Sequence, residues 1–301
     1  MSGAKRSRPA AAARVIPTSA SHPAPRRTAD AAGGAGVATV VCRQLSPVIA
    51  DFDGNRRMIL DAVAESLQSG ADVIVLPELS TSGYTLSSVE EARSVAIDRA
   101  HPLFDELTAL LAESSAVLVF GFCERAGDRV FNSAAVVDAS GVRAVYRKTH
   151  LWDRETLLFS TGTEPPPVVE TAHGMLGVLI CYDLEFPEMP RTLALAGADL
   201  IAVPTNWPLG EHPPGEKPAE VIFAQAAARA NGVFIACCDR AGTERGQRWT
   251  EGTAVIDQFG WVVAPVREAV ARCDIFPALA RDKSISPHND LLGDRRPELY
   301  S

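Results

Sequence analysis

The sequence predicts an α/β protein built on two sheets, and three observations support this. Strongly apolar segments of strand length alternate with segments that have one apolar helical face. The chain has 301 residues, of which 47% are hydrophobic, so it can bury a large core. The order of strands and helices in the first half is repeated in the second. Two sheets packed face to face, with helices outside, would bury both sets of strands.

The first repeat begins at Val37, and its two expected helices both precede its third expected strand. In residues 53–69, Met58, Ile59, Ala62 and Val63 share one face, and Gly70 follows as a natural helix end. A second helix is expected near residues 102–114. The expected strands cover residues 37–45, 72–78, 116–124, 130–138 and 142–148.

The second repeat follows the same order. The expected strands cover residues 174–183, 199–206, 232–239, 251–258 and 261–266, with helices at 187–196 and about 218–230. The segments "GADVIVLPELS" and "GADLIAVPTNW" match in pattern, since each passes from a helix end through a strand to proline and a polar residue. Glu78 and Asn206 should therefore lie at matching strand ends, where α/β proteins place their chemistry.

The first 36 residues differ from the rest in composition. They are rich in Ala, Pro, Ser and Arg and lack the apolar region of a secretory signal, so we expect a disordered tail; an organelle transit peptide is a lesser alternative. They hold six Lys or Arg and one acid, although the net charge of the chain is −8. The acidic remainder argues against nucleic acid as a partner, and no apolar run is long enough to span a membrane.

The six cysteines have no zinc-binding spacing and, in a chain this long, do not suggest a disulfide framework. A reducing, cytoplasmic setting is therefore expected. The histidines also lack metal-ligand spacing, so neither a metal nor another cofactor is predicted.

Three chemically active side chains directly follow apolar strands. Cys181 ends the run "GMLGVLIC", Glu78 ends "VIVLPE" and Lys148 ends "AVYRK". A thiolate is a strong nucleophile, but a free thiol is mostly protonated at neutral pH. A carboxylate whose pKa is raised by burial can take that proton, and an ammonium can stabilise an oxyanion. The three residue types together predict nucleophilic attack on a carbonyl carbon.

These motifs resemble those of the nitrilase superfamily, the carbon–nitrogen hydrolases with a Glu-Lys-Cys triad. "LPELSTSGY", "YRKTHLWDRE" and "ICYDLEFPE" resemble the three motifs in their usual order, and the resemblance covers about residues 37–300. It implies that Glu78 is the general base, Lys148 the oxyanion-stabilising cation and Cys181 the nucleophile. It also implies a second active-site glutamate, for which Glu155 matches best.

The resemblance implies a four-layer α-β-β-α sandwich over residues 37–301 and a homodimer or larger homo-oligomer. The Pro- and Gly-rich loop after Asn206 has the length of a functional loop. The predicted substrate-binding residues are Tyr84, Tyr182, Asn206, Trp207 and Pro208, and Asp183 is expected to support the turn that carries the nucleophile.

The leading interpretation is hydrolysis of a small-molecule amide or N-carbamoyl compound through a thioester on Cys181. The alternative is a nitrilase, although the superfamily's nitrilases commonly carry Trp and Glu where this chain has Tyr182 and Asp183. Several branches that act on carboxylate substrates have Arg at the position of Glu185, so a neutral or basic amide is favoured. A catalytically idle scaffold of the same fold is the remaining hypothesis.

Overall fold

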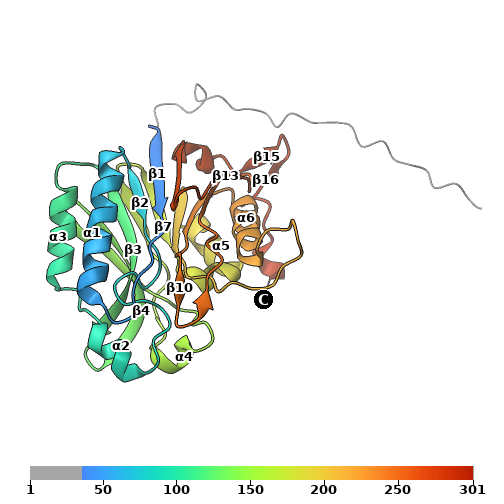
Figure 1. Ribbon diagram of the computed structural model, residues 1–301. Coiled ribbons are helices and arrows are strands. Elements are labelled where there is room, and N and C mark those ends of the chain that lie inside the picture. The colour runs from blue at the N-terminus through green and yellow to red at the C-terminus, as the bar shows by residue number, and fades with distance from the viewer. Residues whose placement is uncertain (1–35, 301) are drawn as a thin grey trace, which may run out of the picture. The chain divides into compact units, whose positions relative to one another are not determined.

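The computed structural model describes residues 36–300, which form two six-stranded sheets packed face to face (Figure 1). Helices α1 and α3 cover the outer face of one sheet, and α5 and α6 cover the other. This arrangement confirms the predicted four-layer α-β-β-α sandwich. The predicted tail lies, except for Gly36, outside the described residues.

The first sheet comes mainly from the N-terminal half of the chain. Its three parallel strands, β1, β2 and β3, are followed by β4 and β5, which run antiparallel to their neighbours. A late strand, β14, closes the other edge against β1. In spatial order the strands are β14 (Val270–Ile275), β1 (Ala38–Arg43), β2 (Val73–Val75), β3 (Val117–Ala126), β4 (Arg129–Asp138) and β5 (Gly141–Arg147).

The second sheet has the same plan. Its parallel strands β7, β8 and β9 are flanked by antiparallel neighbours on both sides. The spatial order is β6 (Val168–Thr171), β7 (Gly174–Val178), β8 (Leu200–Pro204), β9 (Phe234–Cys238), β12 (Ala254–Ile256) and β13 (Val262–Pro265). The two halves are therefore related in topology as well as in sequence pattern.

Side-chain alternation along the strands separates two apolar layers. In β2, Val73 and Val75 face the second sheet, whereas Ile74 faces the helices. The helix layer on the first sheet also contains Ile59 of α1 and Leu107 of α3. Because side chains of a strand alternate between its two faces, a continuous apolar run can fill both layers at once.

The helices are α1 (Phe52–Gln68), α2 (Val89–Val95), α3 (Pro102–Leu111), α4 (Glu155–Leu158), α5 (Glu188–Leu195) and α6 (Ala219–Asn231). The short helix α2 was not predicted, although Ser88 caps it by accepting a hydrogen bond from Glu91 N. Strands β6 and β14 were also missed, because both are short edge strands that mix apolar with polar residues.

Smaller elements complete the structure. They are the hairpins β10 (Thr243–Glu244) with β11 (Gln247–Arg248) and β15 (Ser284–Ser286) with β16 (Asn289–Asp290), and the 3-10 helices η2 (Cys181–Glu185), η3 (Pro277–Arg281) and η4 (Pro297–Leu299). Across residues 36–300, no helix combines the length and apolar composition that crossing a membrane requires.

Gly121 of β3 allows the chain segment around Glu78 to lie directly on the sheet. A Cβ atom at this position would come within 2.5 Å of the Glu78 Cα and 2.6 Å of the Leu79 nitrogen. Backbone hydrogen bonds from Gly121 N to Pro77 O (3.0 Å) and from Ser80 N to Gly121 O (2.9 Å) fix this contact.

Gly121→Ala is therefore expected to lower the free energy of unfolding by about 1–3 kcal/mol, because a backbone must move to admit the methyl group. Gly210→Ala is the matched control, since nothing lies within 4 Å of the Cβ it would add. Urea denaturation of both variants measures the difference. Equal stability of the two variants would show that the contact at Gly121 is not tight.

Candidate active site

The strand directions bring the candidate residues to one edge of the sandwich. Strands β2, β3 and β5 share a direction, because β2 is parallel to β3 and β4 reverses the chain on both sides. Glu78 and Lys148, which follow β2 and β5, therefore lie at the same edge of the first sheet. Cys181 and Asn206 follow β7 and β8, which are parallel neighbours in the second sheet.

Both sheets place a strained residue at this edge. Leu79, directly after Glu78, has φ = 49°, and Cys181 has φ = 47°. The left-handed region is unfavourable for residues other than glycine, so such strain often marks functional sites. At Cys181 it forms a sharp turn from the strand into η2. Hydrogen bonds between Ile180 and Asp183, from Asp183 N to Ile180 O (3.0 Å) and from Ile180 N to Asp183 Oδ2 (3.3 Å), close this turn.

Glu78, Lys148 and Glu155 form a buried ionic cluster. The Lys148 Nζ lies 2.6 Å from Glu78 Oε1 and 2.9 Å from Glu155 Oε1. Asn132 Nδ2 donates to the same two oxygens, at 2.7 Å and 3.3 Å. The Glu155 Oε2 accepts a hydrogen bond from Trp152 N at 3.0 Å. A single ammonium thus holds two carboxylates, and an amide from β4 fixes their positions.

Burial sets the protonation of this cluster. It raises the pKa of Glu78 to about 7; Lys148 opposes this rise and the charge of Glu155 adds to it. Burial alone would lower the pKa of Lys148, but Glu155 and Glu78 together raise it well above its usual value. Lys148 therefore stays an ammonium, whereas Glu78 can gain or lose a proton near neutral pH.

The Cys181 thiol lies beside this cluster, with 5% of the residue exposed. Burial and the neighbouring Glu78 raise the pKa of the thiol well above its ordinary value, and Lys148 acts against them. The sulfur lies 4.0 Å from the carbonyl oxygen of Asn206. The resting thiol is therefore protonated, and nucleophilic attack requires a base that takes its proton.

Two buried aspartates hold the loops around the thiol. Asp183 accepts hydrogen bonds from the Tyr146 hydroxyl (2.9 Å), the Thr149 hydroxyl (2.9 Å) and His150 N (3.0 Å). It thereby ties η2 to the segment that follows Lys148. This agrees with the expectation that Asp183 supports the nucleophile's turn.

Asp239, which follows β9, supports the neighbouring loop. Its Oδ1 accepts hydrogen bonds from Trp207 N and Arg240 N, both at 2.9 Å, and its Oδ2 accepts one from Gly252 N at 2.9 Å. Burial raises the pKa of Asp239 to about 7, although these backbone donors lower it. The aspartate fixes the backbone beside Asn206, whose carbonyl contacts the thiol.

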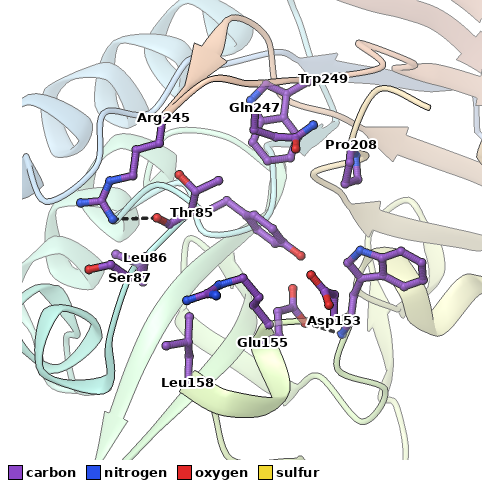
Figure 2. A pocket seen from close by; sticks show the side chains of 13 residues that line it. Thr85, Leu86, Ser87, Asp153, Glu155, Leu158, Pro208, Arg245, Gln247 and Trp249 are labelled. Carbon is purple, nitrogen blue, oxygen red and sulfur yellow. Dashed lines mark hydrogen bonds between the residues drawn. The ribbon is translucent and has the colours of Figure 1, made fainter. Parts of the chain in front are cut away.

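Two neighbouring cavities lie beside the candidate residues, and Trp152 and Pro208 line both. The larger, of about 320 Å³, extends from Glu155 toward Trp249 and Arg245. Figure 2 shows Trp249 and Gln247 on one side of it, with Glu155 and Leu158 on the other. The smaller, of about 100 Å³, contains Cys181. The smaller cavity therefore reaches the Cys181 thiol, and the larger one reaches Glu155.

Four of the predicted substrate-binding residues line these cavities. Tyr84 lines the larger cavity together with Glu155. Tyr182 and Trp207 line the smaller one, and Pro208 lines both. Asn206 lines neither cavity; its Nδ2 donates to the backbone oxygen of Glu78 at 2.8 Å and so joins the two sheets. Contact of these residues with substrate stays a prediction.

Asn132, Trp152 and Asp239 were not identified from the sequence. Asn132 is an amide inside the apolar run "VFNSAAVVD", and Asp239 directly follows the apolar run "FIACC". A polar group within or just after a buried strand needs a partner, and this same signal identified Glu78. Trp152 carries no comparable signal, since its position depends on the loop between β5 and α4. In residues 36–300, no group of three or more His, Cys, Asp or Glu side chains could hold a metal ion.

Comparison with known proteins agrees with this fold. The sequence profile of the carbon-nitrogen hydrolase family matches residues 39–269. A protein named nitrilase from Pyrococcus abyssi is 33% identical over 265 residues, covering 85% of this chain and 97% of the relative. An (R)-stereoselective amidase from Pseudomonas is 30% identical over 254 residues, covering 84% and 89%.

A solved structure shares the architecture. It is a mutant of an amidase from Nesterenkonia sp. AN1 that shows covalent addition of the acetamide moiety of fluoroacetamide at its active-site cysteine. It is 26% identical to this chain, with a TM-score of 0.71, and the match covers 87% of this chain and 95% of that one. This chain belongs to the carbon-nitrogen hydrolase family, within the nitrilase superfamily, and is a hydrolase by membership.

Brief treatment with iodoacetamide should label Cys181 before any other cysteine. Cys42, Cys123, Cys237 and Cys238 are completely buried, and none of these four lines either cavity. Cys273 is partly exposed and is the expected second site. Peptide mapping by mass spectrometry measures the order, with Cys181→Ser as the control. Labelling of Cys273 first, with full activity retained, would contradict Cys181 as the reactive thiol.

Proposed function

We propose that this protein hydrolyses the C–N bond of a small linear amide or N-carbamoyl compound through a thioester on Cys181. The observation that carries the proposal is the buried cluster of Glu78, Lys148 and Glu155 beside that thiol. A carboxylate with a pKa near neutrality, a permanent ammonium and a protonated thiol are the groups that this reaction needs.

The first half of the reaction forms the thioester. Glu78 takes the thiol proton as the sulfur attacks the carbonyl carbon, and the ammonium of Lys148 stabilises the oxygen that becomes negative. The tetrahedral intermediate then collapses, its C–N bond breaks, and Glu78 gives the proton to the departing nitrogen. Ammonia or an amine leaves, and Glu78 is again a carboxylate.

The second half releases the acid. Water enters, Glu78 removes one of its protons, and the oxygen attacks the thioester carbon while Lys148 again stabilises the oxyanion. When the C–S bond breaks, the proton held by Glu78 returns to the sulfur. Glu155, hydrogen-bonded to Lys148, orients the ammonium and the water or leaving amine.

Two observations favour an amide over a nitrile. Tyr182 and Asp183 follow the nucleophile, a pair that resembles amide-hydrolysing branches, and an amidase is among the relatives. The covalent acetamide adduct on the cysteine of the Nesterenkonia amidase supports sulfur as the attacking atom. Nitrile hydrolysis is the second candidate, because the Pyrococcus relative carries the name nitrilase. Homo-oligomeric assembly and a cytoplasmic location stay predictions.

An ammonia-release assay across aliphatic amides, aromatic amides, N-carbamoyl compounds and nitriles tests the proposal. We expect a good amide substrate to yield a hydroxamate when hydroxylamine competes with water for the thioester.

Glu78→Gln should lower turnover about 10²- to 10⁴-fold, because it keeps the shape of the side chain but removes the base. Glu113→Gln, at an exposed position, is the matched control.

The outcomes separate the candidate functions. Rapid turnover of a nitrile with slow turnover of the matching amide would identify a nitrilase. An absence of ammonia from every compound, together with an unreactive Cys181, would indicate an idle scaffold. Near-normal turnover by Glu78→Gln would mean that another group takes the thiol proton.

The pH dependence of kcat/KM should show the raised pKa of Glu78. The base must be ionised, so kcat/KM should rise with pH through an apparent pKa of about 7 and fall about tenfold per unit at lower pH. Initial rates between pH 5 and 9 on one amide provide the profile. A plateau that extends down to pH 5 would assign the proton transfer to a carboxylate with an ordinary pKa.

A further inference from the structure

Two carboxylates share the small cavity with the nucleophile. Glu185 is the last residue of η2, and Glu220 lies in the first turn of α6. Both line the cavity of about 100 Å³ that contains Cys181, and both are partly buried. Because Cys181 lines this cavity, a substrate that the sulfur attacks must lie in it.

The charge of these carboxylates is not balanced by neighbouring cations. Within residues 36–300, neither Glu185 nor Glu220 forms an ion pair with a Lys, Arg or His side chain. The nearby ammonium of Lys148 is already held by Glu78 and Glu155. The cavity thus carries excess negative charge.

The remaining walls of this cavity are largely aromatic. Trp152, Tyr182, Trp207 and Phe223 line it together with the two carboxylates. The faces of aromatic rings attract cations, and Trp does so most strongly. Acidic groups among aromatic rings complement an ammonium and repel a carboxylate, while the small volume admits only a short chain.

We propose that the cavity beside Cys181 is a specificity pocket for an ammonium group, so that the preferred substrates are short amides whose acyl part carries a primary amine. The inference rests on the proposed function, since it names the substrate class of the same site. For a primary amide the leaving group is ammonia, so the recognised cation must belong to the acyl part. Glu185 and Glu220 bind it, and the aromatic rings surround its methylene groups.

Three substrates of matched length test the pocket. They are 4-aminobutanamide, its neutral isostere pentanamide, and glutaramate, which ends in a carboxylate. We expect kcat/KM for the cation to exceed that for pentanamide at least about tenfold, the scale of one charge-assisted hydrogen bond, and glutaramate to be the poorest. A preference for pentanamide or glutaramate would overturn the proposal.

Variants assign the preference to the two carboxylates. Glu185→Gln and Glu220→Gln should each lower the ratio of kcat/KM for 4-aminobutanamide to that for pentanamide by about fivefold or more. Glu188→Gln, an exposed position close to Glu185 in sequence, is the matched control and should leave the ratio unchanged. An unchanged ratio in both pocket variants would remove these carboxylates from substrate selection.

A labelling experiment tests the pocket without turnover. The rates at which 2-aminoethyl and 2-hydroxyethyl methanethiosulfonate modify Cys181 are compared by mass spectrometry, with free cysteine as the reference. The aminoethyl reagent should be favoured beyond its ratio on free cysteine, and the two pocket variants should reduce that advantage. A ratio equal to that of free cysteine would refute the pocket.

The two experiments distinguish the inference from the function on which it rests. If no amide is hydrolysed but the cationic reagent is preferred, the pocket stands and the proposed hydrolysis fails. If amides are hydrolysed with no preference for the cation, the hydrolysis stands and the ammonium pocket fails.

Discussion

The burial of one ammonium between two carboxylates is the constraint on which the rest of this structure depends. Lys148 and Glu78 are fully excluded from solvent, so either charge alone would be strongly unfavourable. Each tolerates burial only because the other, with Glu155 and Asn132, lies within hydrogen-bonding distance. The sheet edge, the tight contact at Gly121 and the strained residue after Glu78 all serve to keep these groups together.

The duplicated topology explains how such a cluster comes to lie beside a thiol. Each half ends its parallel strands at the same edge of the sandwich, so residues that follow β2 and β5 of one sheet meet those that follow β7 and β8 of the other. One half contributes the carboxylates and the ammonium, and the other contributes Cys181 and the acidic cavity.

Much of this arrangement could be predicted from the sequence because its signals are local. An apolar run that stops at Glu78, Lys148 or Cys181 indicates a carboxylate, an ammonium or a thiol at a strand end, and the repeated pattern predicts two sheets. Edge strands such as β14 were missed because their polar residues alternate with apolar ones and the run is short. Asn132 was missed because a single amide in a strand has no visible partner until the fold supplies Glu78 and Glu155.

The sequence by itself determined the α/β class, the two related halves and the three strand ends that carry a carboxylate, an ammonium and a thiol. Residue type and period alone govern these features, because burial of an apolar face and the cost of burying a charge act locally. Only the tertiary structure decided which groups lie within hydrogen-bonding distance of one another and which line the same cavity. The pKa of Glu78 depends on atoms 54 to 77 positions away in the chain, and Glu185 and Glu220 meet only because η2 packs beside α6. Electrostatic interactions depend on distance in space, and folding alone sets that distance.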